Sequence, residues 1–203
     1  MNMVPEGQPA KRRYRMTARA ATAAATGVRI LDAGIALFWE RPRGDITLEE
    51  VAQRAGVSLP TVMRHVKDKD GLYAAAAERE YARVRQQRGS APPGDLPAVV
   101  RVLFDHYEEL GDAVLRLLAE EQRIPALRPI ADVGRATHRE WCERMFAPAL
   151  VGRSGADHTG RLAKLMILTD VYVWKLLRRD QQWDRATAER MMRELIEPLL
   201  GGE

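Results

Sequence analysis

Apolar residues recur along this chain at the spacing of helices, which predicts an all-α protein. Between residues 22 and 39 they fall three or four positions apart, and from Ala188 to Leu199 they follow the i, i+3, i+4, i+7 repeat. No segment shows convincing period-two alternation, the pattern of half-buried strands. Breakers and caps divide the chain into about nine helices.

In the first half of the chain, caps and breakers separate four helices: one over residues 22–39, one over 48–55, a short one of about seven residues after Ser58, and one over 69–87. Thr47 and Glu50 have the spacing of a capping box before the second helix, and Gly56 supplies a tight turn after it. Ser58 and Asp68 are good N-caps for the third and fourth helices. The segment "RGSAPPGD" at 88–95 then indicates a linker.

The second half of the chain predicts helices over residues 96–110, 113–123, 130–146, 161–177 and 187–200. Gly111 and Asp112 are expected to end the first of these, and residues 147–158 are expected to form a loop. The 161–177 segment is apolar nearly all round, so a helix there must be buried on two sides.

Charge is distributed unevenly along the 203 residues. Residues 1–90 hold 16 Lys and Arg against 10 Asp and Glu, whereas residues 91–203 hold 16 against 18. A basic first part indicates a module that binds a polyanion, although scatter among surface charges would give a similar count. Residues 1–20 are expected to form a disordered basic arm, which is either a solvated tail or a contact to phosphates.

Cysteine content and hydropathy limit the environment of the protein. The one cysteine, Cys142, excludes an intramolecular disulfide and fits a reducing cytoplasm. No run of 18 apolar residues predicts a membrane span, and the start of the chain resembles a signal peptide only weakly.

The stretch from Val51 to Leu72 has the geometry of a helix-turn-helix, in which the second helix lies in the major groove of DNA. Residues 30–76 resemble the DNA-binding domain of the tetracycline-repressor (TetR) family. Shared features include "ILDA" at 30–33, "AGVS" at 55–58, and Thr61, Lys69 and Leu72. The resemblance implies a DNA-binding domain at 21–68 and a helical ligand-binding and dimerisation domain at 69–203.

The resemblance also implies which residues contact DNA. Arg64 is the best candidate for reading a base, because its guanidinium can pair with guanine through two hydrogen bonds. Lys69 is expected to bind phosphate beside the free N–H groups of a helix start. Leu59 and Met63 stand where the family often has a basic residue and a tyrosine. The candidate DNA contacts are Thr47, Ser58, Leu59, Thr61, Arg64, His65 and Lys69.

The second half is expected to enclose an apolar or aromatic effector and to form a homodimer through the last two helices. Large side chains with a few polar tips suit such a pocket, although at helical spacing they are more often plain core. Candidate ligand contacts are Phe104, His106, Tyr107, Leu118, Trp141, Cys142, Met145 and Trp174.

The function implied is a transcriptional regulator, most often a repressor, that an effector releases from a near-palindromic operator. One alternative is a small-molecule enzyme, for which Cys142 and His138 lie one helical turn apart but lack a third orienting group. Another is a DNA-binding protein without a ligand, which would not need so large a second domain. No residues have the spacing of a metal site, so no metal or cofactor is expected.

Overall fold

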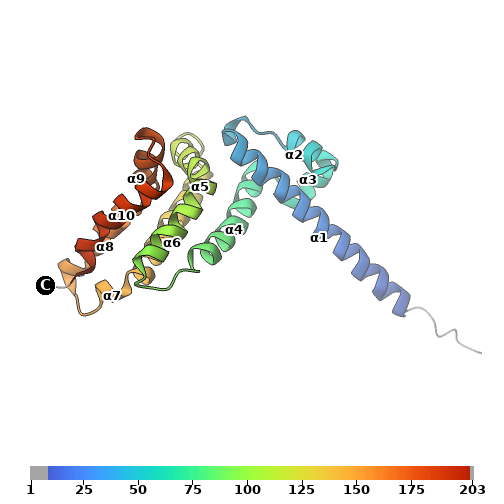
Figure 1. The fold of residues 1–203 in the computed structure, drawn as a ribbon. Coiled ribbons are helices and arrows are strands. Elements are labelled where there is room, and N and C mark those ends of the chain that lie inside the picture. Colours follow the sequence, from blue (N-terminus) through green and yellow to red (C-terminus); the bar gives the residue numbers. More distant parts are fainter. Residues whose placement is uncertain (1–8, 202–203) are drawn as a thin grey trace, which may run out of the picture.

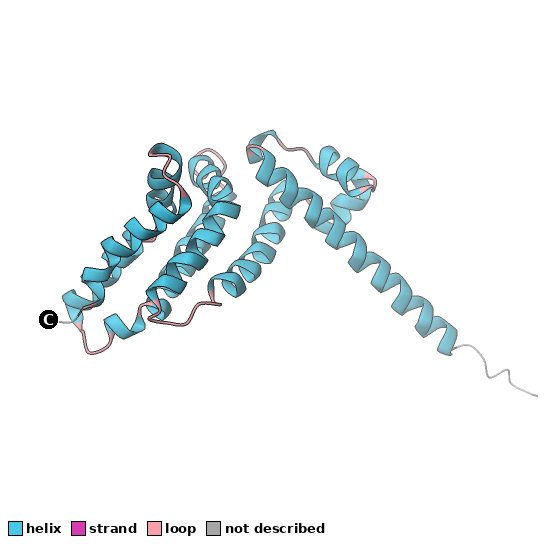
Figure 2. Cartoon of the chain, viewed as in Figure 1, coloured by secondary structure: helices cyan, strands magenta, loops and turns pink. Residues whose placement is uncertain are grey.

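The computed structural model describes residues 9–201, with side chains from residue 19 onward. Every regular element in this part of the chain is helical (Figure 2), which confirms the predicted all-α class. The first helices lie at one side of the molecule and α8 to α10 at the other, with α4, α5 and α6 between them (Figure 1).

Helix α1 (Pro9–Glu40) begins much earlier than the sequence predicted. The expected disordered arm is therefore wrong for residues 9–20, which are helical, while residues 1–8 lie outside the described part. Alanine and arginine are both strong helix formers, and a proline is tolerated at the first helical position. The N-terminal half of α1 extends away from the other helices (Figure 1).

Three helices, the last of them 20 residues long, pack their buried side chains with those of the C-terminal half of α1. They are α2 (Leu48–Ala55), α3 (Leu59–Val66) and α4 (Lys69–Arg88), preceded by the 3₁₀ turn η1 (Arg43–Asp45). Thr47 and Glu50 form the predicted capping box, and Asp68 caps α4 by accepting from the Gly71 N–H. Gly56 ends α2 at φ 65°, a left-handed conformation that glycine adopts without strain.

Helix α5 (Leu96–Glu120) runs without interruption through the residues that were expected to end it. Gly111 is buried in the middle of this helix, against the ring of Trp174. A β-carbon at position 111 would lie 2.5 Å from that ring. The glycine is therefore a site of close packing between two elements, and the predicted break was wrong.

The remaining elements complete the second half of the molecule. They are α6 (Leu127–Met145), α7 (Ala147–Leu150), α8 (Gly155–Leu168), α9 (Val171–Lys175), the π-helical turn η2 (Leu176–Asp180) and α10 (Arg185–Leu200). The predicted 161–177 helix is divided at Thr169 and Asp170, where Asp170 caps α9 by accepting from the Tyr172 N–H. The predicted loop at 147–158 contains α7 and the start of α8.

Buried apolar side chains form two clusters. One joins α1 to α4 around Ile30, Val51 and Leu72, and the other joins α5 to α10 around Phe104, Leu165 and Trp174. Leu127 of α6 belongs to the first cluster, so the two halves share a packed boundary.

One segment of α1, Arg19–Glu40, is long and apolar enough to cross a membrane by length and composition alone. Its later part supplies Ile30, Leu37 and Phe38 to the first cluster. Core helices of soluble proteins share this composition.

Candidate DNA interface and adjoining cavity

Helix α3 presents one face to the core and the other to solvent. Val62 and Val66 are buried, while Arg64 and His65 are exposed and Met63 is half exposed. The helix has only eight residues, and this alternation anchors it through one narrow apolar stripe. Its outer face is therefore available to a partner.

The polar side chains on this outer face form hydrogen bonds with one another. The hydroxyls of Ser58 and Thr61 lie 3.0 Å apart, and Arg64 Nη2 donates to Thr61 Oγ1 over 3.2 Å. Ser58 occupies the N-cap position, but its side chain makes no capping hydrogen bond. Thr47 is exposed at the start of α2.

Two of the other candidates make contacts within the protein. Leu59 is half buried and packs against the first cluster, so the core accounts for part of its apolar surface. Lys69 Nζ donates to the Gly44 carbonyl over 2.9 Å, which ties the start of α4 to η1. A phosphate contact by Lys69 would compete with this bond or share the ammonium group with it.

The junction between α3 and α4 contains a strained residue. Lys67 has φ 67° and ψ −59°, and the Asp68 N–H donates to the Val66 carbonyl over 2.8 Å. These values define a γ-turn of the rare, strained kind. The turn fixes where α4 begins relative to α3.

A polar contact joins the DNA-binding half to α5. The buried carboxylate of Glu120 accepts from the backbone N–H of Arg43 (3.1 Å) and of Gly44 (3.3 Å), and lies 3.9 Å from Arg43 Nη1. Tyr73 Oη donates to the Arg43 carbonyl over 2.7 Å. Elements η1, α4 and α5 are thereby held together at one point.

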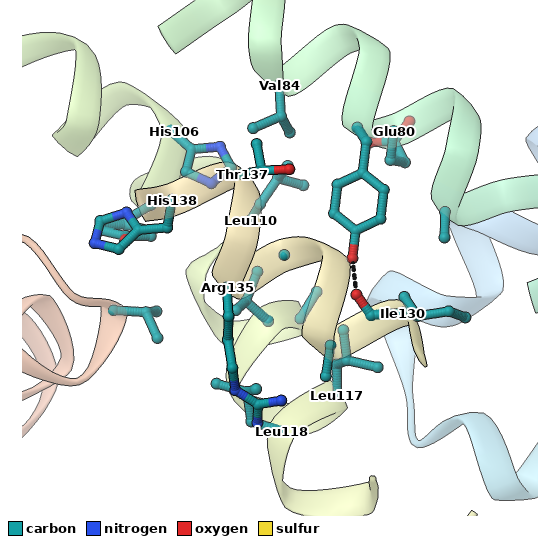
Figure 3. Close-up of a pocket in the computed structure, with 18 of the residues that line it drawn as sticks. Glu80, Val84, His106, Leu110, Leu117, Leu118, Ile130, Arg135, Thr137 and His138 are labelled. Atoms are coloured by element: carbon teal, nitrogen blue, oxygen red, sulfur yellow. Dashed lines mark hydrogen bonds between the residues drawn. The ribbon is translucent and has the colours of Figure 1, made fainter. Parts of the chain in front are cut away.

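A cavity of about 490 Å³ lies next to this junction. Its lining comes from α1, η1 and α4 on one side and from α5, α6, α8 and α9 on the other. Figure 3 shows side chains of α4, α5 and α6 around it, with His106 and His138 at one side and Leu117 and Ile130 at the other. The volume and the mainly apolar lining are typical of small-molecule sites.

Only some of the predicted pocket residues line this cavity. His106, Tyr107 and Leu118 do so. The other five do not line this cavity and are buried in the second cluster; they are Phe104, Trp141, Cys142, Met145 and Trp174. Spacing along a helix identified the buried face but not the part of it that borders empty space.

Several polar groups of the cavity were missed by sequence reasoning. Arg88, which was assigned to the linker, is the last residue of α4 and is 5% exposed. Its Nη2 lies 2.9 Å from His138 Nδ1, and its guanidinium lies 4.1 Å from the centre of the Trp141 ring. An arginine beside a Gly/Pro segment ordinarily indicates surface, so the sequence held no signal for this burial.

Burial lowers the pKa of both histidines near this arginine. The pKa of His106 falls to about 3 and that of His138 to about 4, first through burial and then through the charge of Arg88. Both rings are therefore neutral at pH 7.

Cys142 and His138 do not form a reactive pair. Burial raises the pKa of the Cys142 thiol to about 11, so the thiol stays protonated at neutral pH. Its Sγ lies 3.8 Å from His138 Nε2 and 3.4 Å from Thr169 Oγ1.

The fold and the exposed face of α3 define a helix-turn-helix DNA-binding protein with an attached helical domain. Residues 30–76 match the model of the bacterial regulatory proteins of the tetR family. This segment therefore carries a DNA-binding domain of that family's type, and the chain is similar to DNA-binding transcriptional regulators.

Relatives and solved structures agree with this assignment. The chain is 27% identical over 183 residues to the HTH-type transcriptional repressor KstR of Rhodococcus jostii, covering 83% of this chain and 81% of that protein. Among solved structures, GusR of Salmonella enterica has a TM-score of 0.69 at 17% identity, over 87% of this chain and 95% of the other. SmeT in complex with triclosan has a TM-score of 0.62 at 22% identity, over 87% and 90%. These two show a shared fold.

Proposed function

We propose that the protein is a repressor that a small molecule entering the 490 Å³ cavity releases from its operator. The observation that carries this proposal is that the cavity borders both halves of the molecule. Ile35 and Phe38 of α1 and Tyr73 of α4 contribute to its wall, and these side chains also pack in the cluster that supports α3. A ligand in the cavity therefore contacts the DNA-binding half directly.

The proposed mechanism is a shift between two arrangements of α4. A ligand that binds one arrangement better than the other moves the population towards it, and reciprocity requires that DNA affinity change by the same factor. Glu120 and Tyr73 tie η1 to α5 and α4, so a displacement of α4 reaches the helix-turn-helix. The relative KstR is named a repressor and SmeT was solved with triclosan, which supports this reading.

A homodimer through α8, α9 and α10 is part of the proposal. Exposed apolar side chains lie on these elements and on η2: Ile167, Tyr172, Leu176 and Leu195. Exposed apolar side chains on neighbouring elements suit a protein interface. Two α3 helices about 34 Å apart would reach successive major grooves of a near-palindromic site in cytoplasmic DNA.

The proposed contacts to DNA are the outer face of α3 and its flanks. Arg64 reads a base, Ser58, Thr61 and His65 lie towards the groove, and Thr47 and Lys69 hold phosphates. Leu59 contributes the exposed part of its side chain to the contact with DNA.

Footprinting on the DNA upstream of the protein's own gene tests the proposal. We expect a protected, near-palindromic segment at moderate salt that disappears when a cavity ligand is added. A protected segment that no cavity ligand affects would contradict release by an effector. Absence of any protected segment there and in a genome-wide selection of bound DNA would contradict the regulator itself.

A further inference from the structure

The polar end of the cavity contains an arginine that forms no ion pair. Arg88 forms no ion pair with any described carboxylate, although its side chain is almost completely buried. Its Nε has no hydrogen-bond partner. A buried charge without a partner is strongly unfavourable, so such groups in proteins are ordinarily paired.

The other charged side chains that line the cavity are already engaged. Glu80 pairs with Arg83, Arg43 with Glu120, and Arg135 with Glu121. Asp170 caps α9 through Oδ1 and also lines the cavity; its charge acts on Arg88, but the two side chains form no ion pair. Among the described residues of the cavity wall, Arg88 is therefore the cation that forms no ion pair.

The neighbours of Arg88 position it without neutralising it. The guanidinium lies over the Trp141 ring and 5.9 Å from the centre of the Tyr107 ring. His138 Nδ1 accepts from Arg88, while its Nε2 lies 3.2 Å from the Met166 carbonyl and donates to it, so the ring is a neutral acceptor. Rings on the faces of a guanidinium leave its N–H groups at the edge free for a planar acceptor.

A second polar group of the cavity also lacks a partner. His106 is 5% exposed, lines the same cavity, and its Nδ1 makes no hydrogen bond. A neutral imidazole can donate one hydrogen bond from this atom in the appropriate tautomer. Buried nitrogens without partners cost stability, and a ligand oxygen would satisfy this one.

We infer that the effector is an amphipathic carboxylate, whose anionic group pairs with Arg88 and accepts from His106 while its apolar body fills the rest of the cavity. One cation without an ion pair matches a monoanion; a phosphate monoester carries about −1.5 to −2 charges at pH 7 and would leave an excess of negative charge. Leu110, Leu117 and Ile130 supply apolar wall for the body of the ligand. This inference rests on the proposed function, because it names the ligand class of that cavity.

Matched acids and amides on the same skeletons test the inference. The probes are octanoate, dodecanoate, 2-naphthoate and biphenyl-4-carboxylate, each beside its primary amide, added to the full chain at pH 7.5. We expect at least one acid to raise the melting temperature and to bind roughly tenfold or more tightly than its amide, since hydrogen bonds between charged partners are about twice as strong as neutral ones. Equal binding of acids and amides, or no stabilisation by any acid, would overturn the inference.

Variants identify the group responsible. Arg88→Met should reduce the affinity of the acid to that of its amide without lowering the melting temperature of the ligand-free protein, and Arg88→Lys should restore part of the preference. Arg85→Met, on the exposed side of the same helix, is the matched control and should change nothing. If Arg88→Met fails to fold, His106→Phe gives the second test, with a several-fold loss for the acid and none for the amide. An unchanged preference in the folded variants would contradict the assignment.

The operator footprint separates this inference from the proposed function. A protected operator without a preference for acids would support the proposed regulator and contradict the carboxylate effector. Acid binding that depends on Arg88, without any protected operator, would support the carboxylate site and contradict the proposed regulator.

Discussion

The DNA-binding half and the cavity perform their roles with differently arranged residues. The candidate DNA contacts fall within one stretch, from Thr47 to Lys69, and most of their side chains face outwards. The cavity wall combines residues from Ile35 to Val173, and its side chains face inwards. A surface function can be carried by a local motif, whereas an interior site exists only after distant helices have packed.

The largest expected effect of a single substitution comes from filling the contact between α5 and α9. Gly111→Ala would place a β-carbon 2.5 Å from the buried Trp174 ring. Overpacking of this kind should lower the free energy of unfolding by about 3 kcal/mol, measured by urea unfolding. Gly160→Ala in α8 is the control, because nothing lies within 4 Å of its added β-carbon, and it should be neutral or stabilising. Equal stability of the two variants would show that the interior half is not tightly packed there.

Acid should weaken the protein through the cavity histidines. Because the pKa values of His106 and His138 are about 3 and about 4 in the folded protein, the unfolded chain takes up protons that the folded protein does not. Stability is therefore complete above pH 6.5 and is lost as the pH falls towards 4, by about 2 kcal/mol for each histidine at pH 5. Urea unfolding at pH 7.5, 6 and 5 measures this loss, and His106→Phe should remove about half of it. A wild-type stability that stays constant over this range would contradict the buried, neutral rings.

The same contrast explains how much the sequence predicted. Thr47, Gly56 and Asp68 are local signals, and the capping box, the turn and the start of α4 were all predicted correctly. The prediction of a helix break at Gly111 was wrong because the glycine makes room for Trp174, which is 63 positions away in the sequence. The burial of Arg88 was not predicted because it depends on packing against Trp141. Of the predicted pocket residues, those that border the cavity differ from those that do not in how the helices pack around the cavity. Spacing within one helix contains no information on that.

The link between the two halves gives an intermediate effect. Glu120→Gln removes the charge opposite the half-buried Arg43 while it keeps one oxygen acceptor. We expect a loss of about 1.5 kcal/mol in unfolding free energy, below the usual cost of breaking a buried pair because the isosteric amide remains. Hydrogen exchange at the Arg43 and Gly44 amides should become faster. Glu109→Gln, in an exposed pair with Arg83, is the control and should change neither quantity. Identical behaviour of the two variants would show that Glu120 does not link the two halves.

Two substitutions separate base reading from phosphate binding in the DNA-binding half. Arg64→Ala should weaken the specific operator by roughly tenfold and leave random DNA unaffected, because a two-bonded base contact is lost. Lys69→Ala should weaken both by a similar factor and reduce the salt dependence. Titrations by fluorescence anisotropy at two salt concentrations measure both effects. If neither variant differs from wild type on the operator, α3 is not the reading helix.

The smallest expected effect concerns the γ-turn that joins α3 to α4. Lys67→Gly and Lys67→Ala both remove the exposed charge, but only glycine adopts φ 67° without a β-carbon. We therefore expect the glycine variant to be more stable than the alanine variant by about 1 kcal/mol, the lower end of the cost of such strain. Operator affinities of the two variants should be equal, since they differ in strain and not in charge. A lower operator affinity of the glycine variant alone would show that the strain holds α3 at the angle needed for DNA. In that case the surface half, like the cavity, would depend on a constraint that its exposed side chains do not reveal.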